Sequence, residues 1–331
     1  MNAKKQTEEA SSNESADAGE KEEHELTEEE RKEKALESYR QAGKIAREAL
    51  KKGVSLCKPG KKVIDLIEEV EGYIIEEAGE TGGIGFPMNV SINNVAAHYT
   101  SGPRDFTEIE EGMMVKLDLG VHVEGYVADH ATTINLSDDP ALENLPVAAE
   151  ESMEAAIGML KVGAKTHEIG SKIYEIIKSY NYNPIRDLSG HSLERWIVHG
   201  QKQVPLIPVP TGNVIDADDV IAIETFASTG EGQTHPQNYG NIFQLMITRT
   251  PKIRNKSAKR LIGFIAKNFK TLPFCHRTWS KEIAVPRFAL NELINSGIIM
   301  EHKILSDIKG SYVAQSERTV YIHEGEIEIL T

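Results

Sequence analysis

The sequence predicts an α+β fold with two related halves around an antiparallel sheet. Two observations lead to this prediction: the chain repeats a pattern of helices followed by a strand, and an alternating apolar stretch near residue 113 is typical of a β-hairpin. The length of 331 residues and the apolar content of 40% are enough for one large domain or two. A segment near residues 246–305 has no counterpart in the first half and is predicted to be a helical insertion.

The internal repeat is the main evidence for two halves. Residues 50–60 match residues 160–170 at an offset of 110, and a similar helical pattern follows each. Further on, residues 110–120 lie over residues 216–226 at an offset of 106. Three similarities in the same order predict halves related by a pseudo-two-fold axis, each offering an acid from an equivalent strand. The two acids that this alignment places opposite each other are Asp118 and Glu224.

The first ordered element is predicted to be a helix that begins near Leu26. Thr27 and Glu30 have the spacing of a capping box, and Gly53 is expected to end the helix. A second helix is predicted for residues 61–79. The glycine-rich residues 79–87 are expected to form a loop.

Residues 1–26 are predicted to form an acidic, disordered tail, ahead of a single domain at residues 27–331. Residues 1–30 hold eleven acids against three lysines, out of a net charge of −14 for the whole chain. This charge argues against nucleic acid as a partner of that end, and we expect no DNA binding. The tail is either a solvated spacer or a contact for a basic partner.

Composition also restricts the compartment. No apolar run approaches the roughly 18 residues of a membrane span, and no apolar segment near the N-terminus is typical of a signal peptide. The only two cysteines, Cys57 and Cys275, lie far apart and outside any C-x-x-C pattern, which argues against a disulfide framework or a thiolate zinc site. We therefore expect a cytoplasmic protein without membrane association.

Two acids fall within the predicted hairpin of residues 113–135. Val115, Leu117 and Leu119 alternate with polar residues and glycine, so Asp118 and Asp129 fall in the middle of two paired strands. Burying two carboxylates is costly unless a positive charge lies between them. The alternative is one acid at a strand end and one in a turn.

The second half of the chain contributes further candidates. His191 and His199 are either polar residues satisfied at strand ends or functional imidazoles. Glu224 lies inside the apolar run 221–226, where an acid needs a stronger reason for burial. Glu317 lies in a predicted strand region, and the alternative there is a surface pattern formed with Arg318.

The predicted insertion is basic at its start. The basic residues at this start either form the solvated faces of helices or contact ribosomal RNA. They are Arg249, Lys252, Arg254, Lys256, Lys259 and Arg260.

These residues and their neighbourhoods resemble the type II methionine aminopeptidases of the pita-bread metallohydrolase fold. The resemblance covers roughly residues 30–331 and includes FPMNVSINNVAAHYT with His98, KLDLG, LSGHSL, IETFASTG, TLPFCHRTW and DIKGSYVAQSE. It implies a pita-bread fold, with the insertion that separates type II from type I. The acidic tail is similar to that of the archaeal form.

The resemblance implies removal of the N-terminal methionine from nascent polypeptides, with a preference for a small second residue. It implies two divalent ions (Co, Mn, Fe or Zn), which suit a hard, oxygen-rich ligand set. The implied ligands are Asp118, Asp129, His191, Glu224 and Glu317, of which Asp129 and Glu317 bridge the metals. A hydroxide between the ions would attack the peptide carbonyl.

Further roles follow from the same resemblance. Glu224 would also shuttle a proton to the leaving amine. His98 and His199 would hold the substrate and the tetrahedral oxyanion. The methionine side chain would occupy a pocket that includes Phe86, Val198 and Phe226. We expect a monomer, with the ribosome as a further candidate partner.

The chain departs from the family pattern near its last ligand. Relatives usually read QFEHT, whereas this chain has Ser316 and Arg318 on either side of Glu317, which would change packing or metal affinity. His302 stands where the eukaryotic form has a pocket aromatic, and the role of His235 stays open. The alternatives are a prolidase or aminopeptidase P acting on Xaa-Pro peptides, and a non-catalytic pita-bread binding protein.

Overall fold

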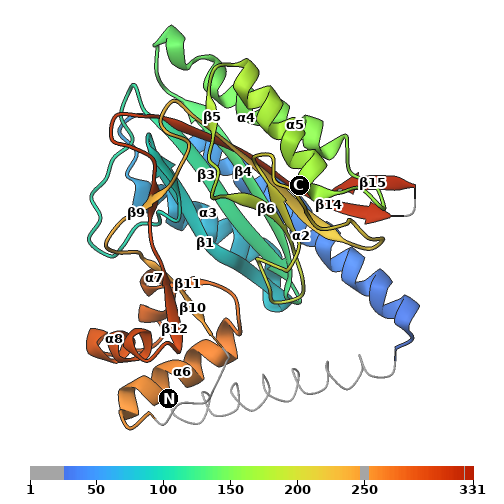
Figure 1. Cartoon of the computed structure of the whole chain (residues 1–331). Helices are drawn as coiled ribbons and strands as arrows, with labels where there is room; N and C mark the ends of the chain where they lie inside the picture. Colours follow the sequence, from blue (N-terminus) through green and yellow to red (C-terminus); the bar gives the residue numbers. More distant parts are fainter. Residues whose placement is uncertain (1–25, 247–252, 324) are drawn as a thin grey trace.

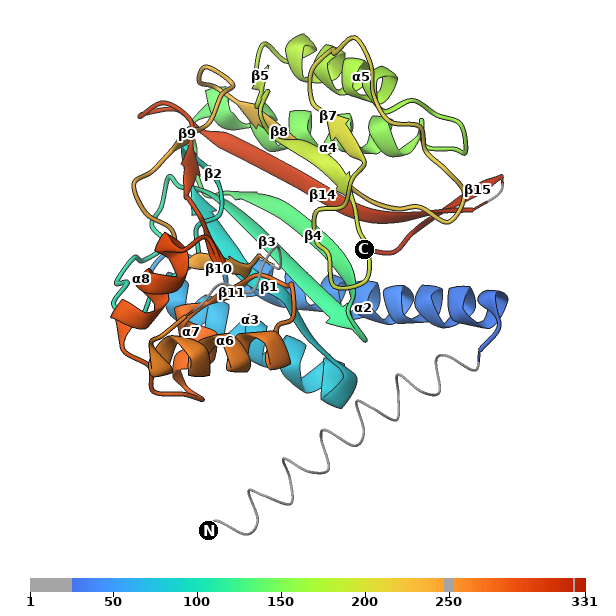
Figure 2. The same cartoon turned by 60° about the horizontal axis from the view of Figure 1, so that its bottom comes forward.

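The structure is a computed structural model that describes residues 26–246, 253–323 and 325–331. The predicted acidic tail lies outside the described residues except for Leu26. Helices pack on one side of a large curved antiparallel sheet, and a smaller unit packs beside its edge (Figures 1 and 2). Among the described helices, none has the length and apolar character needed to cross a membrane.

The first half packs two helices against strands β1, β3 and β4, and it also contains the short β2, which belongs to a separate small sheet. Thr27 caps the first helix, and Glu30 completes the predicted capping box. Ala46, Leu66 and Leu117 are fully buried in the core between the helices and the sheet. The elements are α2 (Glu28–Leu56), α3 (Val63–Ala78), η1 (Gly79–Thr81), β1 (Gly82–Ile92), β2 (Val95–Ala97), β3 (Met114–Val123) and β4 (Tyr126–Asn135).

The second half repeats the plan of two helices followed by strands. Its core contains Ile173, Ile223 and Val320. The elements before the insertion are η2 (Pro140–Leu142), α4 (Asn144–Ile157), α5 (Thr166–Ser179), β5 (Asn183–Pro184), β6 (Ser189–Ser192), β7 (Gln203–Pro205), β8 (Val220–Ser228), β9 (His235–Pro236) and β10 (Ile242–Leu245). Those after it are β13 (Leu305–Ser306), β14 (Val313–His323) and β15 (Glu326–Ile329).

Strand order shows how the halves join. The main sheet runs β1-β3-β4-β14-β8-β6-β7, so β4 and β14 form the central pair and β3 and β8 flank it. The repeat therefore corresponds to two structural halves, and the α+β prediction is confirmed. The aligned acids Asp118 and Glu224 lie on these two flanking strands.

The predicted hairpin is confirmed as β3 and β4. Val123 pairs with Tyr126, so Glu124 and Gly125 form a two-residue turn, with φ of 50° and 89°. Positive φ at both positions is the requirement of a type I′ turn, whose twist matches that of paired strands. The turn sets the register that brings the two hairpin acids to one face.

Two local predictions about glycines are wrong. Helix α2 continues past Gly53 to Leu56. Gly53 instead packs closely against the sheet, where an added Cβ would lie 3.2 Å from Leu117 Cδ1. Part of the predicted loop at residues 79–87 is the start of β1. There, a Cβ on Gly82 would lie 2.5 Å from the His122 carbonyl oxygen. In both places glycine permits a close approach rather than ending an element.

The segment predicted as an insertion has its own core. Leu261, Phe274 and Trp279 are buried in it. It is not purely helical, because it contains two short strands, and β10, which precedes it, pairs with both of them. Of the basic residues predicted at its start, Arg249 and Lys252 lie outside the described residues. Its elements are α6 (Lys256–Asn268), β11 (Phe274–Cys275), α7 (His276–Ser280), α8 (Arg287–Asn295) and β12 (Ile299–His302).

Candidate metal centre

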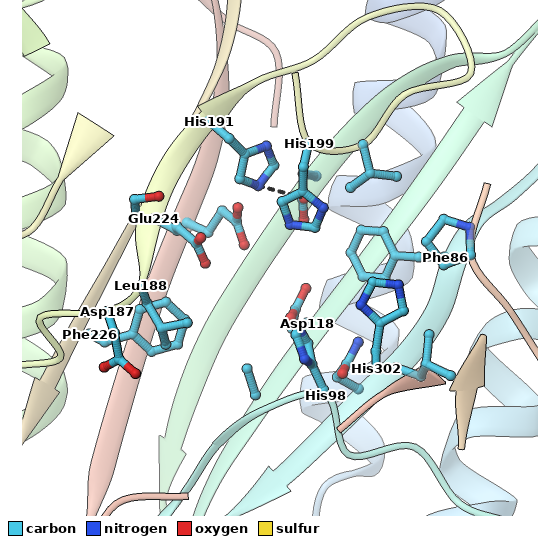
Figure 3. Close-up of a pocket in the computed structure, with 18 residues that line it drawn as sticks. Phe86, His98, Asp118, Asp187, Leu188, His191, His199, Glu224, Phe226 and His302 are labelled. Carbon is cyan, nitrogen blue, oxygen red and sulfur yellow. Dashed lines mark ion pairs between the residues drawn. The ribbon is translucent and has the colours of Figure 1, made fainter. Parts of the chain in front are cut away.

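A cavity of about 220 Å³ lies on the sheet face opposite the helices, and all ten site residues proposed from the sequence line it. They come from both halves and from the loops between strands. Figure 3 shows their side chains converging around a central group of acids. The ten are Phe86, His98, Asp118, Asp129, His191, Val198, His199, Glu224, Phe226 and Glu317.

Strand register explains why three of the acids converge. Asp118 pairs with Ala131, Ala131 pairs with Glu317, and Glu317 pairs with Glu224. These residues form one row across β3, β4, β14 and β8, and paired residues point to the same face of a sheet. The small Ala131 leaves room between the acids on either side of it.

The other two candidate ligands occupy the next row on the same face. Asp129 lies two residues from Ala131 on β4, and His191 on β6 pairs with Ala222, two residues from Glu224. Residues two apart on a strand share a face. As a result His191 Nε2 lies 3.8 Å from Asp129 Oδ2.

Several atoms of these residues are buried without a hydrogen-bond partner. They are Asp118 Oδ1, Asp129 Oδ1, His191 Nδ1 and Glu317 Oε1. Leaving one buried polar atom unpaired costs about 1–3 kcal/mol, so four such atoms in one cavity favour a bound group from outside the chain. Ligand atoms of Asp129, His191 and Glu317 all lie within 4.8 Å of one another, which is close enough to hold one cation.

The pKa values of the four acids show the same need for positive charge. Burial raises the pKa of Asp118 to about 7. Burial, followed by repulsion from neighbouring acids, raises the pKa values of Asp129, Glu224 and Glu317 well above their ordinary range. The amide of Gln315 donates to Glu317 Oε2 at 3.3 Å, but an amide supplies no charge.

The histidines of the cavity are neutral. Burial, and then the neighbouring His199, lowers the pKa of His191 well below its ordinary value. Burial lowers the pKa of His199 to about 4 and that of His302 to about 3. A neutral imidazole keeps the lone pair that a metal ion requires. Four hard carboxylates with one neutral imidazole therefore fit divalent cations.

His98 is held in a strained conformation. Its φ is 65°, which is uncommon for a residue other than glycine and often marks a functional site. Its Nδ1 lies 3.2 Å from the Lys303 carbonyl oxygen, and its ring lies 5.5 Å from that of His302. His302, expected at the position of a pocket aromatic, lines the cavity beside His98, and its Nε2 is 3.1 Å from Gln244 Oε1.

The apolar candidates lie on two sides of the cavity. Phe86 and Val198 belong to one apolar cluster, whereas Phe226 belongs to the core of the second half. In Figure 3, Phe226 lies with Asp187 and Leu188 across the acids from Phe86. Sequence reasoning did not select Asp187 or Leu188, although both directly precede the Ser189-Gly190-His191 motif.

The two departures beside the last ligand, Ser316 and Arg318, lie away from the cavity. Neighbours on a strand alternate faces, and Ser316 and Arg318 accordingly are absent from its lining. Arg318 Nη1 donates to the Glu317 carbonyl oxygen at 2.8 Å and lies 3.3 Å from His130 Nδ1. His235 is exposed and lies 3.6 Å from Glu231, also outside the cavity.

Comparisons with known proteins identify the family of this chain. The model of metallopeptidase family M24 matches residues 37–256. The methionine aminopeptidase of Methanocaldococcus jannaschii is 39% identical over 88% of this chain and 96% of its own length. Methionine aminopeptidase 2 of Schizosaccharomyces pombe is 35% identical over 88% of this chain and 71% of its own length.

Solved structures share the fold at lower identity. A thermophilic Arx1 superposes with a TM-score of 0.77 at 22% identity, with 90% of each chain covered. A methionine aminopeptidase from Thermotoga maritima superposes with a TM-score of 0.66 at 22% identity, over 90% of this chain and 96% of that one. The chain therefore has the pita-bread fold and belongs to metallopeptidase family M24, among the methionine aminopeptidases.

Proposed function

We propose that this chain is a metal-dependent exopeptidase that removes the N-terminal methionine from newly made polypeptides. The observation that carries the proposal is the convergence of Asp118, Asp129, His191, Glu224 and Glu317 on one cavity that no lysine or arginine of the described chain lines. The full-length similarity to methionine aminopeptidases supplies the substrate class.

The five residues would hold two divalent cations. Asp118, Asp129, His191, Glu224 and Glu317 would supply the ligand atoms, with Asp129 and Glu317 as the shared ligands. When bound, the cations supply Lewis-acid activation of water and of the scissile carbonyl. Four negative charges balance two divalent ions, which removes the repulsion that raises the pKa values of the acids.

Glu224 and the histidines would handle protons and hydrogen bonds. Glu224 would take the proton of the attacking water and deliver it to the leaving amine. His98 Nδ1 donates to the Lys303 carbonyl, so its Nε2 is an acceptor and would receive the substrate peptide N–H. His199 would donate to the oxygen on which negative charge develops.

The methionine side chain would occupy the side of the cavity formed by Phe86, Val198 and His302. Thioether sulfur makes favourable contacts with aromatic edges. A small second residue would be preferred because a larger one would collide with the rim of the cavity. Phe226 would line the path of the peptide beyond the scissile bond, on the opposite side of the acids.

A peptide assay with metal analysis tests this function. The protein loaded with a divalent metal should release methionine from Met-Ala-Ser much faster than it cleaves an Xaa-Pro peptide. Preference for the Xaa-Pro bond would replace the proposal with a prolidase-like activity. Failure to bind any divalent ion in a titration would instead favour a non-catalytic binding protein.

The cellular setting is part of the same proposal. The substrates would be nascent chains in the cytoplasm, where the free and buried thiols of Cys57 and Cys275 stay reduced. Exposed Lys256, Lys259 and Arg260 on α6 make the ribosome a further partner, since ribosomal RNA attracts basic surfaces. Salt-sensitive co-sedimentation of the protein, as a monomer, with ribosomes would test this contact.

A further inference from the structure

Asp187 carries a negative charge in the wall of the cavity that the metal centre does not use. It lies in the loop between β5 and β6, is exposed, and lines the same cavity as the candidate ligands. In Figure 3 it lies beside Leu188 and Phe226, across the central acids from Phe86 and His302. This is the side along which the peptide would continue after the methionine.

The Asp187 carboxylate is held in place by hydrogen bonds rather than by a cation. Its Oδ1 accepts from the Thr234 backbone N–H at 2.9 Å, and its Oδ2 accepts from the Thr234 hydroxyl. Thr234 follows a glycine-containing loop. Asp307 holds this loop in place, because its Oδ2 accepts a hydrogen bond from the Gly232 backbone N–H at 3.0 Å. A carboxylate fixed in this way loses little freedom when it meets a partner.

No described residue neutralises this charge. The neighbouring Arg186 donates instead to the carbonyl oxygens of Glu231 and Gly232. Among the described residues that line the cavity there is no lysine or arginine. Two divalent ions would balance the four ligand acids, so Asp187 would leave the mouth of the loaded site negative.

We propose that Asp187 is a specificity-determining residue that favours substrates with a basic side chain at the third position. The inference rests on the proposed function. The second residue is small and does not extend to the wall, whereas a lysine or arginine at the third position has a long flexible stem. The attraction between an exposed pair of opposite charges is modest, so Asp187 tunes the choice among substrates.

Matched peptides test the preference in the full-length protein loaded with a divalent metal. Met-Ala-Lys-Gly, Met-Ala-Gln-Gly and Met-Ala-Glu-Gly are compared by kcat/KM, together with a peptide in which acetylation removes the lysine charge. We expect the lysine peptide to exceed the glutamate peptide by about two- to five-fold at low salt, and the difference to fall near 1 M salt. Acetylation should abolish the lysine advantage.

Two variants separate charge recognition from structural damage. Asp187→Asn keeps the acceptor for the Thr234 N–H and removes the charge, so it should bring the rates of the lysine and glutamate peptides together. Asp138→Asn makes the same charge change at an exposed residue outside the cavity and should preserve the preference.

Three outcomes would overturn the inference. The first is an unchanged lysine-to-glutamate ratio in Asp187→Asn, and the second is an equal change in Asp138→Asn. The third is a uniform loss of all rates in Asp187→Asn, which would mean that the side chain only supports the loop. In each of these cases the wild type still releases methionine, whereas failure to release it from any peptide refutes the proposed function itself.

Discussion

The buried carboxylate of Glu71 and the buried carboxylates of the candidate metal centre differ in how their charge is balanced. Glu71 on α3 is paired with Arg277 of α7 at 2.6 Å and accepts the Met88 backbone N–H at 3.1 Å. In the part of the chain that the structure describes, no lysine or arginine lines the cavity that holds the acids of the candidate metal centre. Lys116, two residues from Asp118, donates instead to the Asn93 carbonyl oxygen.

This difference distinguishes a structural ion pair from a candidate functional site. The Glu71–Arg277 pair joins the insertion to the first half, and Arg277 also donates to the Ser101 carbonyl oxygen at 2.6 Å, so its charge is used within the chain. The central acids have unpartnered atoms and raised pKa values, so their balance must come from outside. A buried acid left without a partner by its own fold is thus the stronger sign of a functional site.

Removing a central ligand should have the largest effect. Glu317→Ala or Asp129→Ala should lower kcat at least about a thousand-fold, beyond the ~10²–10³ typical of losing one stabilising donor, because each change also releases metal. Turnover and elemental analysis of the same samples check this. Retention of two metal ions per chain in either variant would contradict the bridging assignment.

Breaking the paired group should affect stability instead. Arg277→Met leaves Glu71 buried without its cation and should cost about 3–5 kcal/mol in the free energy of unfolding. Denaturant titration measures the loss, and the double variant Glu71→Leu with Arg277→Met should recover most of it. A loss below about 1 kcal/mol in the single variant would show that Glu71 finds another partner.

The pH dependence of stability should reverse when metal binds. The raised pKa values mean that the metal-free fold prefers protonated acids, so their stabilisation is present below pH ~4 and is lost as pH rises through the folded values, about 7 for Asp118. The free energy of unfolding of the metal-free protein should therefore fall by several kcal/mol between about pH 5 and pH 8.

Metal-loaded protein should not show this fall, because the cations favour the ionised acids. Denaturant titrations at several pH values, with and without chelator, make the comparison. In the metal-free protein, Asp118→Asn should reduce the slope. A slope that is identical with and without metal would place the cations elsewhere.

Replacing His98, a neutral side chain in the same cavity as the acids, should have the smallest of these effects. His98→Ala should lower kcat about a hundred-fold, as expected for a residue that positions a proton-bearing group, while the metal content stays the same. Parallel assays and elemental analysis would test it. Loss of metal from this variant would mean that His98 is itself a ligand.

Much of the fold was accessible from local patterns. The alternation of residues 113–135 and the Glu124-Gly125 turn predict the hairpin, because side-chain period and turn chemistry are properties of neighbouring residues. The repeat identified two halves and aligned Asp118 with Glu224. The family resemblance then identified the remaining candidate ligands by their order along the chain.

The roles of individual glycines and the positions of residues in the cavity walls could not be predicted from local sequence patterns. Gly53 was interpreted as a helix end, yet its place against Leu117 depends on how a helix packs on a strand some sixty residues later. Phe226 was predicted to share a pocket with Phe86 and Val198; all three line the cavity, and only the structure shows that Phe226 lies across the acids from Phe86.

The sequence by itself therefore determined the main helices and the hairpin, which follow from local spacing, and its family resemblance named the candidate ligands. Only the tertiary structure decided which of them meet. Glu317 lies beside Glu224 and Ala131 because β14 inserts between β8 and β4. Pairing between strands so distant in sequence is set by the packing of the whole sheet, and the charge left unbalanced there becomes visible only once that packing is known.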